Sequence, residues 1–137
     1  ISSAEGAYAL ERAAVAGVPS TVVSPYTTLG PEKAKTVSRD EKRFAVSNGV
    51  LELCQEHQIE AIVLAGFLTV LGGDIIQEYK GRIINLHPAL LPKFGGEGMW
   101  GHHVHEAVVA AGEEKTGITI MYMAEGLDTG DMLLKAE

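Results

Sequence analysis

The stretch AIVLAGFLTVLGGDIIQEYKGRIINLHPALLP, residues 61–92, decides the fold class. Its first five residues, 61–65, are all apolar, which predicts a strand buried on both faces of a sheet. A short helix is predicted over residues 74–79 and a second apolar strand over residues 82–86. Strand, helix and strand at this spacing are typical of a βαβ unit with parallel strands.

The rest of the chain extends this alternation of helices and strands. We therefore expect a single α/β domain over residues 1–137, a Rossmann-like open sheet that is mostly parallel and has helices on both faces. A capping box, Ser38-x-x-Glu41, predicts a helix that runs to about His57 and passes through Asn48-Gly49 without a break. The other predicted elements are helices over 4–16 and 103–111, strands over 19–24, 116–123 and 131–135, and a loop over 26–36.

Composition limits the function classes. The 137 residues are 46% hydrophobic and 21% charged, a balance typical of a globular domain. The formal net charge of -7 disfavours a nucleic-acid partner, because an acidic surface repels phosphates. No apolar run approaches the roughly 20 residues that a membrane-spanning helix needs, and no signal peptide is visible. Cys54 is the single cysteine, so no intrachain disulfide forms, and we expect a cytoplasmic protein.

The end of the second predicted strand carries a pair of polar residues suited to acyl transfer. Asn85 and His87 are two positions apart, so an extended strand places them on the same side. An amide can hold a carbonyl oxygen as it becomes an oxyanion, and an imidazole can handle or support the proton of an attacking amine. From the spacing alone, a histidine that merely caps the strand end is an equally good interpretation.

Two further loops follow predicted strands, where ligands of open α/β sheets bind. Residues 124–131 form an acidic turn whose Asp128 would stabilise an imidazolium form of His87 if the two lie close. A plain hairpin turn with solvated acids explains the same residues. Residues 66–72 are apolar and could line a slot for a flat ring, or could pack under the following helix.

A histidine cluster, His102, His103 and His105, invites a metal-site interpretation. A metal site needs three or four ligands in fixed geometry, and neither a second cysteine nor an HExxH pattern supplies them. We therefore predict no metal site.

The run Asn85-Leu86-His87-Pro88-Ala89-Leu90-Leu91-Pro92 closely resembles the formyltransferase family that uses 10-formyltetrahydrofolate. Ala65-Gly66-Phe67 and the Asp128 turn match the same family in order and distance, and the resemblance covers essentially all 137 residues. It implies that Asn85 binds the formyl oxygen, that His87 is the catalytic imidazole, and that Asp128 orients it and assists proton transfer.

The resemblance also implies a folate site for the co-substrate 10-formyltetrahydrofolate, with no metal. The pterin ring would lie in the loop of Leu68, Thr69, Val70 and Leu71. Ala124, Glu125 and Asp128 would close its other side, with Asn85 at the formyl group. Arg43 would contact the folate, and Pro88 the second substrate.

The acceptor of the formyl group is implied less directly. Residues 93–101 and His105-Glu106-Ala107 resemble the branch of the family that formylates the amine of glycinamide ribonucleotide in purine synthesis. Residues 119–121 and 126–133 look more like the branch that formylates methionyl-tRNA. A hydrolase of the formyl-folate and an inactive folate-binding fragment also fit the same residues. The family's N-terminal phosphate-binding segment and its C-terminal segment have no counterpart here, so we expect this piece alone to be a weak enzyme or none.

Overall fold

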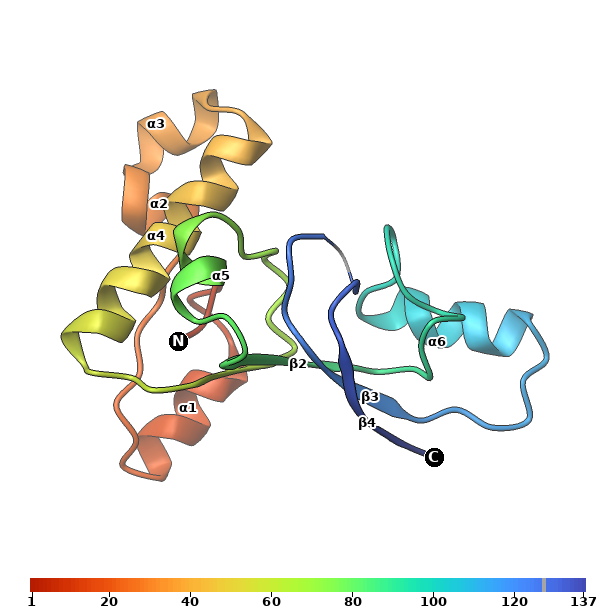
Figure 1. Ribbon diagram of the computed structural model, residues 1–137. Coiled ribbons are helices and arrows are strands. Elements are labelled where there is room, and N and C mark those ends of the chain that lie inside the picture. Colours follow the sequence, from red (N-terminus) through yellow and green to blue (C-terminus); the bar gives the residue numbers. More distant parts are fainter. Residues whose placement is uncertain (127) are drawn as a thin grey trace. The chain divides into compact units, whose positions relative to one another are not determined.

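The computed structural model describes residues 1–126 and 128–137 (Figure 1). They divide into two compact units. The first unit is Ile1–Ile59 with Thr69–Ile75, and the second is Glu60–Leu68 with Ile76–Glu137. Helix α5 (Asp74–Glu78) begins in the first and ends in the second.

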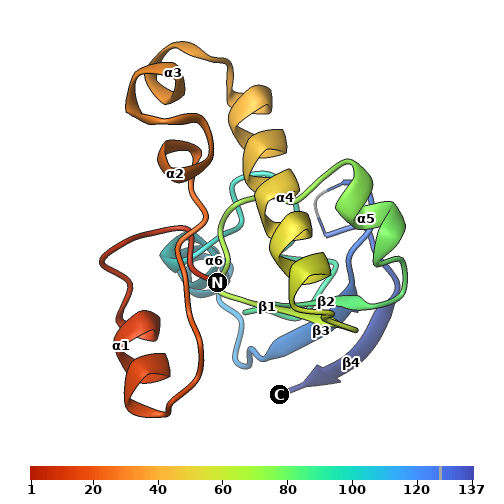
Figure 2. The same cartoon turned by 90° about the vertical axis from the view of Figure 1, so that its left-hand side faces the viewer.

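The first unit is helical. Its short helices α2 and α3 lie close to each other, and α2 also packs against α4 (Figure 2). The strand predicted over residues 19–24 is reduced to an isolated parallel bridge between Ser2 and Val22. Its helices are α1 (Tyr8–Val15), α2 (Pro25–Leu29), α3 (Pro31–Thr36) and α4 (Arg39–Glu56).

The loop predicted over residues 26–36 was wrong, because α2 and α3 occupy it. Ser24 starts α2 with a capping box: Thr27 N donates to Ser24 Oγ at 3.2 Å, and Ser24 N donates to Thr27 Oγ1 at 2.8 Å. Pro25 and Pro31 stand at the first position of each helix, where a missing N–H costs nothing. Pro31, interpreted as loop punctuation, is therefore a helix start.

Helix α4 begins with the predicted capping box. Glu41 N donates to Ser38 Oγ at 3.2 Å, and Ser38 N donates to Glu41 Oε2 at 3.0 Å. The Ser38 hydroxyl also donates to Glu41 Oε2, at 2.9 Å. The backbone N–H of Ser38 and, after it, this hydroxyl lower the pKa of the Glu41 carboxyl below its ordinary value. The helix continues through Asn48-Gly49 to Glu56, as predicted, and its buried face is Val46, Ser47, Val50 and Cys54.

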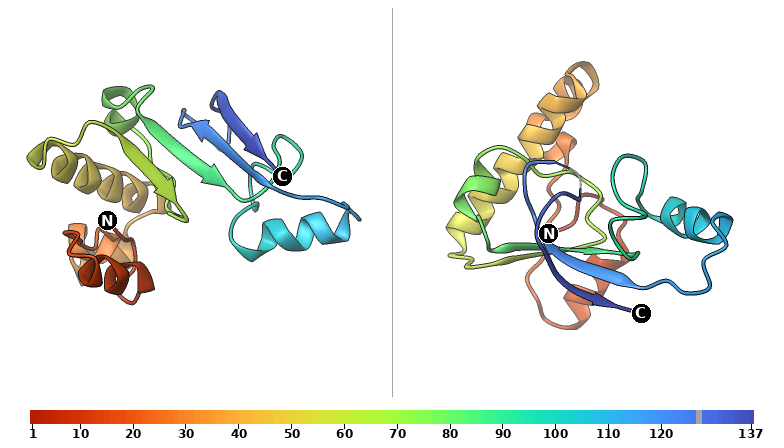
Figure 3. Two further views of the ribbon diagram at one scale, coloured as in Figure 1. Left: turned by 90° about the horizontal axis from the view of Figure 1, so that it is seen from below. Right: turned by 45° about the vertical axis from the view of Figure 1, so that its right-hand side comes forward.

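The second unit is built on a four-stranded sheet in the order β1-β2-β3-β4, which Figure 3 shows from below. Strands β1 and β2 are parallel, with Ile62 opposite Ile83, as the βαβ unit predicted. The pairs β2–β3 and β3–β4 are antiparallel. The strands are β1 (Ile62–Ala65), β2 (Ile83–His87), β3 (Ile118–Tyr122) and β4 (Met132–Ala136), and α6 (His102–Ala110) lies between β2 and β3 in the chain.

The α/β class is confirmed, but the sheet is mixed rather than mostly parallel. Residues 123–131 are too few for the crossover that a parallel β3–β4 pair needs, so these strands form a hairpin. The expectation that residues 61–65 are buried on both faces is also corrected, since Val63 is 61% exposed. An apolar run indicates that burial is favourable, but it does not say what covers each face.

The loop after β2 and helix α6 share a small hydrophobic core. Ala89 and Phe94 from the loop pack with Val104 and Val108 from α6, which places residues 88–101 against the helix. In the described part of the chain, every helix is too short or too polar to cross a membrane.

Candidate active site

Strand β2 carries Asn85 and His87 at its carboxyl end. Asn85 pairs with Leu64 of β1 and Met121 of β3, and His87 pairs with Thr119 of β3. A central position in the sheet fixes the backbone of both residues. Asn85 is half-buried and His87 is 4% exposed, so the imidazole lies in a largely water-free environment.

Both ring nitrogens of His87 face an oxygen. Nε2 lies 2.6 Å from the carbonyl oxygen of Phe94. A carbonyl oxygen only accepts, so Nε2 carries a proton. Nδ1 lies 3.7 Å from Oδ2 of Asp128, an ion-pair distance rather than a hydrogen bond. The ring therefore lies between a carbonyl oxygen and a carboxyl oxygen.

Asp128 lies in the turn between β3 and β4, in the left-handed region with φ of 53°. Aspartate tolerates this region better than most side chains. Its Oδ2, the oxygen that faces His87, accepts a hydrogen bond of 2.9 Å from the backbone N–H of Gly96. The loop of residues 94–96 therefore contacts both members of the His87–Asp128 pair. The structure brings this pair together, as the Asp128 interpretation required.

Thr119 fastens the loop after β2 to the sheet. It is fully buried, accepts a hydrogen bond from Leu91 N at 3.0 Å, and donates one to the carbonyl oxygen of Ala89 at 2.8 Å. Pro88, between His87 and this anchored segment, is half-buried. The anchor limits the movement of the backbone that leads from His87 to Phe94.

The predicted folate residues of the first unit form a group of their own. The Arg43 guanidinium donates from Nε to the carbonyl oxygen of Val70 at 3.1 Å and from Nη2 to that of Leu71 at 3.2 Å. Ser47 Oγ accepts from Gly72 N at 3.0 Å, so α4 holds this loop at two points. Leu71 is 1% exposed, so its side chain is part of the core.

The remaining predicted folate residues differ in exposure. Leu68 is 60% exposed, Thr69 and Ala124 are half-buried, and Glu125 is exposed. Glu125 accepts a hydrogen bond of 3.3 Å from Gln77 Nε2. Leu127, in the same turn, lies outside the described residues.

Sequence reasoning missed three contributors to the site: the carbonyl of Phe94, the N–H of Gly96 and the side chain of Thr119. The first two are backbone groups, which have no side-chain signature. Thr119 could have been noticed as a hydroxyl within an otherwise apolar strand, because a buried hydroxyl needs hydrogen-bond partners.

Comparison with known proteins agrees with this architecture. A family model described as "Formyl transferase" matches residues 1–137. The trifunctional purine biosynthetic protein adenosine-3 of Drosophila pseudoobscura pseudoobscura is 37% identical over 136 residues, which are 99% of this chain and 9% of that protein. The phosphoribosylglycinamide formyltransferase of Bacillus subtilis (strain 168) is 38% identical over 93 residues, 68% of this chain and 45% of the relative.

Solved structures give the same result. The phosphoribosylglycinamide formyltransferase from Bacillus halodurans superposes with a TM-score of 0.75 at 33% identity, over 97% of this chain and 60% of that one. The glycinamide ribonucleotide transformylase 1 from Symbiobacterium toebii has a TM-score of 0.78 at 28% identity, over 97% of this chain and 55% of that one. The chain thus spans less than two thirds of the length of these relatives.

Proposed function

Because the chain belongs to the formyl transferase family, we propose that it is part of an enzyme that transfers a formyl group from 10-formyltetrahydrofolate to the amine of glycinamide ribonucleotide. Support comes from relatives and structural neighbours named for that transfer. The same proposal includes a single catalytic domain and a cytoplasmic enzyme that binds two small-molecule substrates. The acidic net charge of -7 counts against a tRNA acceptor.

The proposed reaction is a direct transfer. The amine nitrogen attacks the formyl carbon, and the formyl oxygen becomes negatively charged. The bond from that carbon to N10 of the folate then breaks, and the proton lost by the amine replaces the formyl group on N10. In this scheme the side-chain amide of Asn85 donates to the developing oxyanion, because a fixed donor contributes most where charge appears in the transition state.

The observation that carries the proposal is the placement of His87 between a carbonyl oxygen and a carboxylate. Both ring nitrogens of His87 are directed at protein oxygens. In the proposed reaction an imidazolium form of His87 would stabilise the oxyanion, and another group would first accept the amine proton. Asp128 sustains that charge, since burial of an unpaired imidazolium is unfavourable. Proton transfer then passes through Asp128 or a water that it binds.

Two segments are proposed as folate-binding: the loop of Leu68, Thr69, Val70 and Leu71, and the turn at Ala124, Glu125 and Asp128. Leu71 would contribute through its backbone, because its side chain is buried, whereas the exposed side chain of Leu68 is accessible to a ligand. Arg43 would act by positioning, since its guanidinium already binds the carbonyl oxygens of residues 70 and 71. Pro88, next to His87, would contact the acceptor. The proposed transfer uses no metal.

The test is a formyl-transfer assay on the protein with its natural ends. We would offer glycinamide ribonucleotide, methionyl-tRNA and water as acceptors, and compare Asn85→Ala, His87→Asn and Asp128→Asn with wild type. Removal of one oxyanion donor lowers kcat by roughly 10²–10³, so Asn85→Ala should lose about that factor. A matched control is His105→Asn, which changes an exposed histidine of α6 in the same way.

Transfer to glycinamide ribonucleotide that is lost in the three variants and kept in the control would support the proposal. Activity on methionyl-tRNA or water alone would refute the acceptor and leave the site. A folded protein inactive with all three acceptors would refute the proposed reaction, as would full activity of His87→Asn.

A further inference from the structure

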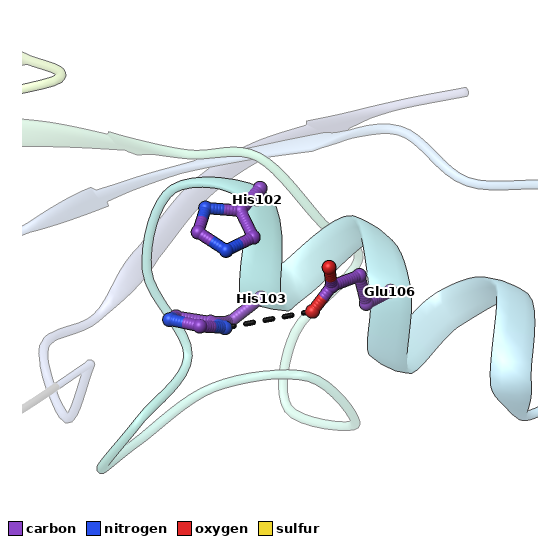
Figure 4. A group of neighbouring side chains, drawn as sticks. All are labelled: His102, His103 and Glu106. Carbon is purple, nitrogen blue, oxygen red and sulfur yellow. Dashed lines mark ion pairs between the residues drawn. The ribbon is translucent and has the colours of Figure 1, made fainter.

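Three potential metal ligands converge at the first turn of α6. His102, His103 and Glu106 each offer one ligand atom, and these atoms all lie within 4.8 Å of one another (Figure 4). The spacing brings Glu106 to both histidines, because residues three and four apart share a face of a helix. His102 and His103 are adjacent in the chain, and their ring centroids lie 4.1 Å apart. In Figure 4 both imidazoles stand beside each other, and Glu106 reaches back from the next turn. Its Oε2 lies 3.5 Å from His103 Nδ1.

The ligand set fits a divalent transition-metal ion. Two imidazoles and one carboxylate are a known zinc combination, with the fourth position open to water. Imidazole also suits copper and nickel, whereas calcium and magnesium prefer oxygen ligands. In tetrahedral coordination, two ligands at about 2.1 Å from zinc lie about 3.4 Å apart. Closing the group onto an ion therefore brings its most widely separated ligand atoms more than about 1 Å nearer to each other, a movement that rotation of the side chains supplies.

Two opposing effects act on such a site. The N-terminal end of a helix carries a partial positive charge, which lowers the affinity for a cation by a small factor. The carboxylate of Glu106 offsets this charge. The ligands are accessible, with 43% exposure of the His103 side chain and 70% of Glu106, so an ion can enter without unfolding.

The same turn also lacks the usual capping interaction. Gly101 stands at the N-cap of α6 and provides no side-chain hydrogen bond to the first N–H groups. An ion held by residues 102, 103 and 106 would link the first turn to the second. Helix α6 also packs on Phe94 through Val104 and Val108, so this link would stabilise the small core under the loop.

We propose that His102, His103 and Glu106 bind one divalent transition-metal ion of the Zn²⁺, Cu²⁺ or Ni²⁺ class and that the ion fastens the start of α6. This departs from the prediction that the histidine cluster carries no metal. That prediction considered His102, His103 and His105 together. In the structure, the side chain that lies beside His102 and His103 is that of Glu106, not that of His105. The proposal is independent of formyl transfer.

The experiment is calorimetric titration of Zn²⁺ into the metal-free protein with its natural ends. Wild type should bind one equivalent of Zn²⁺. His102→Ala and Glu106→Gln should each raise the Kd for Zn²⁺ by at least about tenfold, since loss of even an outer partner of a metal ligand costs 10–100-fold. The matched control, His105→Ala, removes an exposed histidine two residues from His103 and should bind Zn²⁺ like wild type.

A second readout uses Trp100, whose ring centroid lies 4.7 Å from that of His103. Cu²⁺ should quench its fluorescence, and Trp100→Phe would identify the part of the signal that belongs to this residue. Zn²⁺ should also raise the melting temperature of wild type but not of His102→Ala, as a ligand that binds only the folded state requires. Equal Zn²⁺ affinity in wild type, His102→Ala and Glu106→Gln would overturn the proposal, and so would an equal loss in His105→Ala.

Discussion

Replacing Thr119 with valine tests how the loop after His87 is held. Valine has the shape of threonine and suits a strand, but it removes the hydroxyl that accepts from Leu91 N and donates to the carbonyl oxygen of Ala89. Both backbone groups lie at buried residues, at 4% and 0% exposure, so water does not readily replace the lost partner.

The magnitude follows from these two contacts. A buried polar group left without a partner costs about 1–3 kcal/mol, so two such groups cost about 2–6 kcal/mol. The added methyl group recovers about 1 kcal/mol of hydrophobic burial. We expect Thr119→Val to lower the free energy of unfolding by about 3 kcal/mol. The control is Thr119→Ser, which keeps the hydroxyl and loses one methyl group, at about 1 kcal/mol.

The assay is equilibrium unfolding in urea of the protein with its natural ends, with the three proteins compared at equal denaturant slope. The order of stability should be wild type, then serine, then valine. A valine variant as stable as the serine variant would refute the reasoning, because it would mean that the hydrogen bonds of Thr119 do not hold the loop.

Gly130→Ala should destabilise the β3–β4 hairpin by about 2 kcal/mol, because the new Cβ would overlap the backbone oxygen of Tyr122. Thermal unfolding measures this effect, and an unchanged melting temperature would contradict it. Burial raises the pKa of the Cys54 thiol, so a disulfide reagent at neutral pH should label it only after denaturation; fast labelling of the native protein would disprove its burial. Hydrogen bonds from Ser38 lower the pKa of Glu41 from 4.5, so its stabilising effect is complete above that pH and is lost as pH falls through the lower, folded-state pKa. The stability difference between wild type and Glu41→Gln, measured in urea, should therefore shrink on acidification, and a constant difference would count against the capping box.

The elements with local causes could be predicted from the sequence. Helix α4 has its capping box at Ser38 and Glu41, and both signals lie within one turn. The parallel β1–β2 pair follows from two apolar runs joined by a short helix. The failures have a different cause. The short helix α2 begins with a capping box in which Thr27 completes the cap at Ser24. This pattern is weaker than the turn signal of the neighbouring Gly30-Pro31, which led to the prediction of a loop.

The direction of a strand depends on contacts far apart in the sequence. After α6, strand β3 could pair with β2 in a parallel or an antiparallel direction. The residues Ile118–Tyr122 do not indicate that the pair is antiparallel. The candidate site shows the same division. Asn85 and His87 could be identified from a strand pattern and a family resemblance, while the distance of 3.7 Å from His87 to Asp128 is a product of the fold.

The environment of His87 is set by backbone more than by side chains. The carbonyl of Phe94 fixes the proton on Nε2, and the N–H of Gly96 orients the carboxylate that faces Nδ1. Neither group depends on the chemistry of a side chain, so residue 94 can vary as long as it still packs against Ala89, Val104 and Val108. Gly96 is the exception, because its φ of 91° is strained for every residue with a Cβ. A side chain there would redirect the N–H that holds Asp128, and the imidazolium form of His87 would lose its partner.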